Sequence, residues 1–328
     1  MSYADSLGFV ALPGKPPLID PQTRPKVSVV HLTSVPPMVK TFDDALAAHD
    51  AFKKTALANK DVTHVCKKSD LPVLPPFIGM LFGMQHAPED ITKASQVREL
   101  AEHGVQFMAL AYEGKTRYGS GFLADGGLTE EGKRLIRWMG DCGIALDVSH
   151  ANNQTAEEAL RFIKSERIPI FPLASHSGAG MAFAHPRNLS DEVLYLLYDT
   201  GGYVGIPMVT FLICSPKMLE KYPSALVHHV IVARILCHKE QVGIGSDCFY
   251  GEMTMDEARG EYARMTAMLK TNGRFGEYFP DRPEVLITDG TRLMRHAEKM
   301  LAAKFPEKEV RNLCGGNFIR YLRRVLPD

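Results

Sequence analysis

GIALDVSHANNQT, at residues 143–155, joins a short apolar run directly to a polar one. Residues 144–146 have the composition of a buried strand, and the strand ends on the histidine at position 150. Thr155, followed by an alanine and two glutamates, is typical of a helix start. A strand followed at once by a helix is half of a βαβ unit, so this stretch indicates an α/β fold.

The same alternation of strand and helix runs along the whole chain. Strands are expected at 7–12, 27–32, 77–83, 105–111, 143–149, 168–175, 202–208 and 241–246. Helices are expected at 41–58, 91–103, 129–141, 154–165, 190–200, 224–238, 255–270, 289–304 and 307–324. Eight strands of this kind predict a closed (β/α)8 TIM barrel, whose alternative is an open doubly wound sheet. No glycine-rich dinucleotide fingerprint follows the first strand, which disfavours the open sheet.

Composition narrows the classes of partner. The 328 residues carry a formal net charge of zero, with 45% hydrophobic and 23% charged residues, as in an ordinary globular protein. Without a basic excess we expect no nucleic-acid partner, and without a long apolar run we expect no membrane span. The six cysteines form no CxxC motif and the N-terminus has no signal-peptide pattern, so reduced thiols and a cytoplasmic location are expected. One barrel domain over 1–328 accounts for the length, with 250–290 as a lid or interface insertion.

Three polar residues close expected strands. His150 and His176 end two neighbouring strands, and Asp247 ends a later one. In a barrel these positions meet at the carboxyl-terminal face, where active sites lie. Neutral imidazoles and a carboxylate are ligands that zinc prefers. A lone histidine after a strand is more often a hydrogen-bonded loop residue, but the repetition at matching strand ends favours a metal site.

Four stretches make the chain resemble the membrane (renal) dipeptidase family of zinc metallopeptidases, which have amidohydrolase-type TIM barrels. They are DGGLTEEGKRLIRWMGDCGIALDVSHANNQT (125–155), ASHSGAGMAFAHPRNLSDEVL (174–194), VGIGSD (242–247) and GGNFIRYL (315–322). The resemblance implies a hydrolase that cleaves a peptide or amide bond at a two-zinc centre, and it implies a homodimer. It implies that His150, His176 and Asp247 belong to the metal centre and that Arg187 binds the carboxylate of a small substrate.

The chain departs from the family pattern at several positions. The bridging glutamate falls on Gln85, and a substrate-contacting histidine is replaced by Tyr112. The family's His-x-Asp after the first strand falls on Leu7 and Phe9. An alternative alignment puts it on residues 22 and 24, but we prefer the first because the second lies too close to the next strand.

These departures predict a reduced metal site. Two histidines and one aspartate carry a single formal negative charge, which supports one zinc ion and not two. Asp247 is either the third ligand or the general base, and Gln85 orients water or a substrate amide. The leading hypothesis is thus a metallohydrolase of a small carboxylate-bearing amide, with weak or altered dipeptidase activity. The alternatives are a non-catalytic small-molecule-binding relative and a member with lyase or isomerase chemistry.

Other polar residues near expected strand ends are weaker candidates. They are His31, His86, His185, Arg117 and Cys248. The histidines are expected to be structural or loop residues, and the cysteine to be a packing residue. Arg117 shares the loop of Tyr112 and is a candidate for substrate selection.

Overall fold

Parallel strands form the centre of the protein in a computed structural model. The structure describes residues 2–9, 27–74, 76–250 and 290–328, with residues 256, 259, 260 and 263. The strands are β1 (Tyr3–Phe9), β2 (Val27–Val35), β3 (Val62–His64), β4 (Ile78–Met84), β5 (Val105–Ala109), β6 (Ala145–Asp147), β7 (Leu173–Ala174), β8 (Tyr203–Ile206), β9 (Val242–Ile244) and β10 (Cys248–Phe249). Their order is β10-β1-β2-β4-β5-β6-β7-β8-β9, with β3 beside β4.

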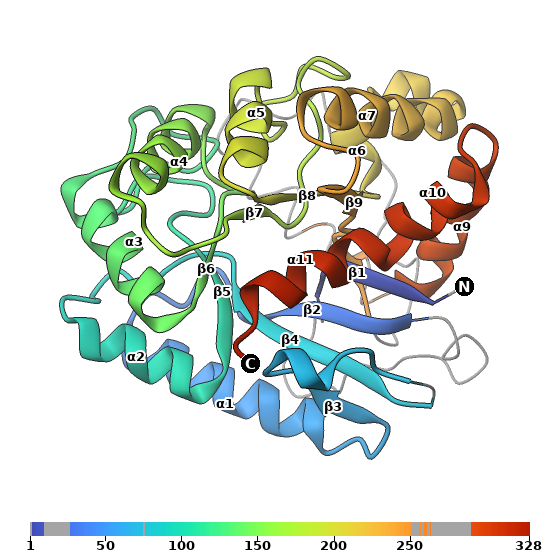
Figure 1. The fold of residues 1–328 in the computed structure, drawn as a ribbon. Coiled ribbons are helices and arrows are strands. Elements are labelled where there is room, and N and C mark those ends of the chain that lie inside the picture. The colour runs from blue at the N-terminus through green and yellow to red at the C-terminus, as the bar shows by residue number, and fades with distance from the viewer. Residues whose placement is uncertain are drawn as a thin grey trace.

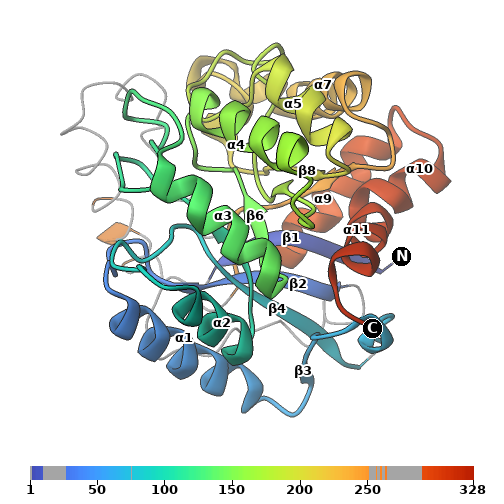
Figure 2. The same ribbon diagram turned by 60° about the vertical axis from the view of Figure 1, so that its left-hand side comes forward.

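Helices surround these strands in chain order (Figures 1 and 2). They are α1 (Phe42–Leu57), α2 (Ala94–His103), α3 (Glu130–Cys142), α4 (Asn153–Glu166), α5 (Asp191–Asp199), α6 (Thr210–Ile213), α7 (Tyr222–Leu236), α9 (Gly290–Ala302), α10 (Glu307–Arg311) and α11 (Asn317–Val325). The helix starts expected at 129 and 190 are confirmed, because Thr129 caps α3 and Ser190 caps α5, each through a side-chain oxygen. The start expected at Thr155 is wrong by three residues, because Asn152 caps α4 and accepts from the N–H of Thr155.

The sheet closes on itself through the segment between β9 and β10. The short strand β10 pairs in parallel with β1, and the backbone N–H of Asp247 donates to the carbonyl of Leu7 at 2.9 Å. The buried carboxylate of Asp5 in β1 accepts from the Ser246 N–H at 2.7 Å and from the Tyr250 hydroxyl at 2.6 Å. The predicted TIM barrel is therefore confirmed, and the open doubly wound sheet is excluded.

The barrel interior changes from apolar to polar along its axis. At the amino-terminal end, α11 packs into the barrel and covers one residue from each of seven strands. The cluster contains Ala4, Val29, Leu81, Phe107, Ala145, Leu173 and Tyr203 from the strands, with Phe318, Tyr321 and Leu322 from α11. Further along the axis Gly245 is required, because a Cβ atom there would lie 1.8 Å from the carbonyl oxygen of Ser175. Polar side chains can thus converge at the opposite, carboxyl-terminal end.

The structure corrects some expected elements. The helix expected over 307–324 is broken into α10 and α11 by a π-helical turn at Asn312–Gly316. The break falls at Gly315, whose backbone is not helical, and glycine is required there because a Cβ atom would lie 2.5 Å from the Ala4 nitrogen. The short elements β3 and α6 were not expected. The expected helix at 255–270 and the insertion at 250–290 fall almost wholly outside the described residues.

No helix in the described part of the chain has both the length and the apolar composition needed to cross a membrane.

Candidate active site

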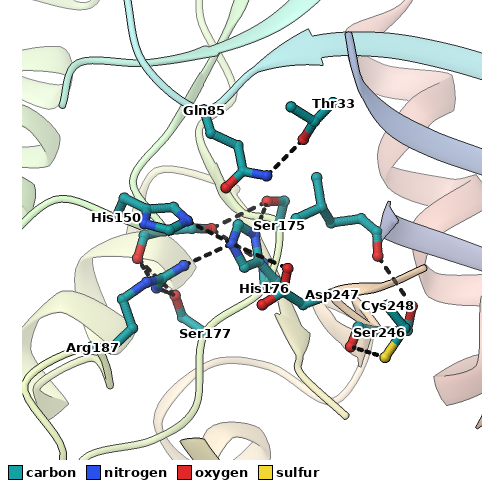
Figure 3. A network of polar contacts seen from close by, with 12 residues as sticks. Thr33, Gln85, His150, Ser175, His176, Ser177, Arg187, Ser246, Asp247 and Cys248 are labelled. Atoms are coloured by element: carbon teal, nitrogen blue, oxygen red, sulfur yellow. Dashed lines mark hydrogen bonds and ion pairs between the residues drawn. The ribbon is translucent and has the colours of Figure 1, made fainter. Parts of the chain in front are cut away.

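The expected site residues gather at the carboxyl-terminal end of the barrel (Figure 3). Gln85 follows β4, Tyr112 follows β5, His150 follows β6, His176 follows β7 and Asp247 follows β9. Arg187 comes from the loop between β7 and α5. The structure therefore brings together residues that lie between positions 85 and 247 of the sequence.

The two histidines face each other. Their Nε2 atoms are 2.9 Å apart, and both side chains are buried. Burial first, and the positive charge of Arg187 second, hold the pKa of each imidazole well below its usual value, so both rings are neutral. The Tyr112 ring stacks on His150 with a centroid distance of 4.0 Å, which fixes the plane of that imidazole.

The carboxylate of Asp147 links the ends of β6 and β7 by hydrogen bonds. Asp147 at the end of β6 accepts from the N–H and hydroxyl of Ser149 at 3.0 and 2.6 Å, and from the N–H and hydroxyl of Ser175 at 3.1 and 2.5 Å. Sequence reasoning missed Asp147, Ser149 and Ser175 as site residues. The signal was present, because both neighbouring strands end in Ser-His.

This arrangement sets the tautomer of His176. The Ser175 hydroxyl hydrogen goes to Asp147, so the Ser175 oxygen is left to accept from His176 Nδ1 at 2.7 Å. The Nδ1 atom therefore carries the hydrogen and Nε2 has a free lone pair. An independent contact agrees, since the Arg187 guanidinium, which can only donate, lies 2.7 Å from the same Nε2.

Arg187 is a buried cation in the middle of the site. Its side chain also donates to the carbonyl of Ser149 and, at 2.8 Å, to the hydroxyl of Ser177. All three acceptors are neutral, and no carboxylate of the described residues lies within 4 Å of the guanidinium. Burial lowers the pKa of Arg187 to about 10, partly offset by the negative charges of Asp247 and Asp147. A buried charge without a direct counter-ion is costly, so an anionic ligand would stabilise it.

Asp247 lies on the side of His176 opposite to Arg187 (Figure 3). Its Oδ1 is 4.0 Å from His176 Nε2, and its side chain is 21% exposed. Its backbone has a φ of 53°, an uncommon conformation for a residue other than glycine, which follows from the turn that joins β9 to β10. Burial raises the pKa of this carboxyl to about 7, although the charge of Arg187 acts in the opposite direction. Such a carboxyl group changes its protonation state near neutral pH.

Gln85 lies beside the pair of histidines but is turned toward β2 (Figure 3). Its amide nitrogen donates to the hydroxyl of Thr33 at 2.6 Å. The amide oxygen is the only ligand atom that Gln85 offers to a cation, and it carries no formal charge.

The side chains gathered here include donors of the kinds that zinc prefers. Two neutral imidazole nitrogens converge, and a carboxylate is within reach of them. Leu7 and Phe9 lie in β1, and neither side chain offers a metal ligand. The alternative positions 22 and 24 lie outside the described residues. Among the side chains that the structure describes, no three His, Cys, Asp or Glu gather tightly enough to enclose a metal in this conformation, in which the guanidinium contacts His176.

The weaker candidates have structural contacts. His86 Nε2 contacts the Val39 carbonyl, and His31 Nδ1 contacts the Ser6 carbonyl at 2.8 Å. Further contacts are those of His185 Nδ1 with the Arg187 N–H at 3.1 Å, Cys248 Sγ with the Ser246 carbonyl at 3.0 Å, and Arg117 with the Glu89 carbonyl at 3.2 Å.

Comparison with known proteins decides the family. The family described as membrane dipeptidase (peptidase family M19) matches residues 22–277, which is more than half of the chain. The chain belongs to the membrane dipeptidase family. This is a family of metallopeptidases.

Individual relatives are distant. The chain is 25% identical to dipeptidase 3 of Rattus norvegicus over 257 residues, which are 76% of this chain and 45% of that protein. The chain spans less than half the length of the curated relatives it matches. Two solved structures share the fold over nearly their whole length. An amidohydrolase from Pseudomonas aeruginosa has a TM-score of 0.78 at 22% identity and covers 99% of this chain and 96% of its own. A metallo peptidase from Rhodobacter sphaeroides has a TM-score of 0.72 at 17% identity and covers 99% of each chain.

Proposed function

We propose that this member of the membrane dipeptidase family is a zinc-dependent hydrolase that cleaves a peptide or amide bond in a small carboxylate-bearing substrate. The observation that carries the proposal is the pair of converging His150 and His176 nitrogens beside a buried Arg187 that lacks a carboxylate partner. The first feature suits a metal and the second suits an anionic substrate group.

In this proposal one zinc ion is held by His150 and His176, with Asp247 as third ligand or as general base. Zinc supplies Lewis-acid polarisation of the scissile carbonyl and lowers the pKa of water toward about 7. The chain prepares His176 for that ion, because the hydrogen bond from Nδ1 through Ser175 to Asp147 leaves Nε2 free to coordinate.

The other side chains bind and orient the substrate. Arg187 pairs with the substrate carboxylate, since its planar fork matches two carboxylate oxygens. Tyr112 presents a ring beside His150 and limits which side chain fits there. Asp247 accepts a proton from the attacking water when it acts as base, and its pKa of about 7 suits that role near neutral pH.

Comparison with relatives supports the substrate class. The Rhodobacter sphaeroides metallo peptidase that shares this fold was solved with a phosphinate mimic of the dipeptide L-Ala-D-Ala. Such a ligand carries both a tetrahedral group at the scissile position and a carboxylate. The proposal gives the corresponding places in this chain to the histidine pair and to Arg187.

A second candidate function is favoured by the residues at Leu7, Phe9 and Gln85. An apolar β1 end and a neutral amide are poor surroundings for a hydrolytic metal centre, so a non-catalytic protein that binds a small carboxylate in the same pocket is the alternative. Metal content separates the two functions, because only the hydrolase needs zinc. Altered lyase or isomerase chemistry would be recognised from its products.

The test is metal analysis followed by an activity assay. Protein stripped with a chelator is titrated with zinc, and the hydrolysis of N-acyl amino acids and dipeptides is followed at each zinc content. We expect activity to rise with the first equivalent of zinc and His150→Ala to lose both zinc and activity. Activity that is absent at full zinc occupancy, or unchanged in His150→Ala, would overturn the hydrolase proposal.

A further inference from the structure

Two N–H donors already contact the nitrogen that zinc would need. His176 Nε2 has one lone pair, and it lies 2.7 Å from the Arg187 guanidinium and 2.9 Å from His150 Nε2. Because His176 carries its hydrogen on Nδ1, His150 must donate from Nε2 in this contact. This leaves His150 Nδ1 as a buried atom without a hydrogen-bond partner among the described residues. The lone pair that zinc would need on His176 Nε2 is therefore already used by hydrogen bonds within the site.

We propose that Arg187 competes with zinc for His176 and that a substrate carboxylate, by drawing the guanidinium away, makes zinc bind more tightly. This inference rests on the proposed zinc centre. It adds a role for Arg187 before catalysis, in which one side chain couples the binding of the metal to the binding of the substrate.

The competition follows from charge and from geometry. A guanidinium hydrogen bond and a zinc ion cannot use the same lone pair, and two cations in a buried site repel each other strongly. Arg187 is held beside His176 by neutral acceptors only, namely the Ser149 carbonyl and the Ser177 hydroxyl. A carboxylate is a stronger partner for a guanidinium than these acceptors are.

The coupling must be reciprocal. If a carboxylate raises the affinity for zinc by some factor, zinc raises the affinity for that carboxylate by the same factor. The nearby Asp247 does not pair with Arg187 as a substrate carboxylate would, because no contact within 4 Å joins its carboxylate to the guanidinium.

The first experiment measures zinc affinity in competition with a chromophoric chelator. We expect Arg187→Met, which keeps the bulk and removes the charge, to bind zinc roughly 5- to 150-fold more tightly than the unmodified chain. The control is Arg161→Met, which removes an exposed arginine that pairs with Glu157 and Glu192 on the outside of the barrel. This control is expected to leave zinc affinity unchanged, and His176→Ala is expected to abolish the gain of Arg187→Met. Unchanged or weaker zinc binding in folded Arg187→Met would overturn the proposal.

The main arm of the second experiment uses the unmodified protein, and Arg187→Met serves as its control. The zinc affinity of the unmodified protein is measured with N-acetylglycine and, as a matched control, with N-acetylglycinamide, which lacks the carboxylate. We expect N-acetylglycine alone to tighten zinc binding, and to have no such effect in Arg187→Met. Equal zinc affinity with both additives overturns the coupling, as does a full effect that persists in Arg187→Met.

These results are distinct from those that test the enzyme activity. Tighter zinc binding by Arg187→Met, together with no turnover of any amide by the zinc-loaded unmodified chain, would support the competition and contradict the hydrolase. Zinc-dependent turnover by the unmodified chain, with equal zinc affinity in the unmodified chain and Arg187→Met, would support the hydrolase and contradict the competition.

Discussion

At the scale of single residues, the site depends on which groups accept hydrogen bonds from one buried guanidinium. Arg187 is 4% exposed and has three neutral acceptors. Its charge is therefore available to a ligand, and the shape of the guanidinium decides how well that ligand is held. Lysine would keep the charge but lose the second donor arm.

We expect Arg187→Lys to weaken carboxylate binding by about 1.5–3 kcal/mol, the usual value of a charge-assisted hydrogen bond. Binding of N-acetylglycine by calorimetry measures this loss, and the melting temperature is expected to change little. A variant with normal ligand binding and a clearly lower melting temperature would show that Arg187 has a structural role only.

Ser175 provides a second test at this scale, because it transmits the charge of Asp147 to His176. We expect Ser175→Ala to lower zinc affinity by roughly 10- to 100-fold, since His176 is then free to adopt the wrong tautomer. The nitrogen-15 shifts of His176 would report the tautomer directly. Ser190→Ala is the matched control, because it removes the cap of α5 and costs about 1 kcal/mol of stability away from the site. Equal zinc affinities in the two variants would contradict this positioning role.

At the scale of secondary-structure elements, β1 and the segment after β9 close the barrel around a buried acid. Asp5 of β1 accepts from Ser246 and Tyr250, and burial raises the pKa of Asp5 from 3.8 to about 6 despite these hydrogen bonds. The folded state therefore holds a proton on Asp5 between about pH 4 and pH 6 that the unfolded chain releases. The contribution of Asp5 to stability is fully present below pH 3.8 and falls as the pH rises toward 6.

We expect Asp5→Asn to remove this decrease in stability with rising pH, because asparagine has no charge to bury. The difference in unfolding free energy between the unmodified chain and Asp5→Asn should change by up to roughly 3 kcal/mol between pH 4 and pH 6.5. Urea denaturation at several pH values measures it in zinc-free protein. A difference that stays constant over this range would show that Asp5 is ionised at both ends.

Periodicity predicted the elements well where they are long and poorly where tertiary contacts set their ends. The expected helix at 154–165 became α4 at Asn153–Glu166, with its cap at Asn152. The expected strand at 168–175 shrank to two residues at Leu173–Ala174, because only these pair with the neighbouring strands. The break at Gly315 depends on the approach of β1 from the other end of the chain, which no local pattern shows.

The candidate site was predictable to a similar extent. Strand-end position and the family resemblance predicted one site for His150, His176, Asp247 and Arg187, and the structure brings these side chains together, while their roles stay predictions. Neither could show that Arg187 donates to His176, or that Asp147 joins two strand ends through Ser149 and Ser175. Those contacts depend on side-chain geometry, since Arg187 and His176 are 11 residues apart along the chain and Asp147 and Ser175 are 28 apart.

At the scale of the whole molecule, the barrel has the fold of the membrane dipeptidase family, and the end of β1 carries Leu7 and Phe9, which offer no metal ligand. The strands, helices and closing segment place the side chains of His150, His176 and Asp247 on the same face. In the proposed one-zinc site, the difference from a two-metal enzyme is confined to a few side chains. The homodimer and the cytoplasmic location stay predictions.

We expect ordinary dipeptides to be poor substrates for this protein. A two-metal centre holds both the attacking and the departing atoms, with a bridging carboxylate between the ions. Here Gln85 offers a neutral amide, and Leu7 and Phe9 offer no ligand, so the proposed site holds only one ion. Loss of a single strong electrostatic contact commonly lowers turnover by about 100- to 1000-fold. Tyr112, stacked on His150, further restricts which substrate is oriented well.

The measurement is a broad dipeptide panel with added zinc, beside N-acyl amino acids and related small amides and esters. Turnover above roughly 10 per second on several unrelated dipeptides, which is the median for enzymes, would show that the missing ligands do not limit this site.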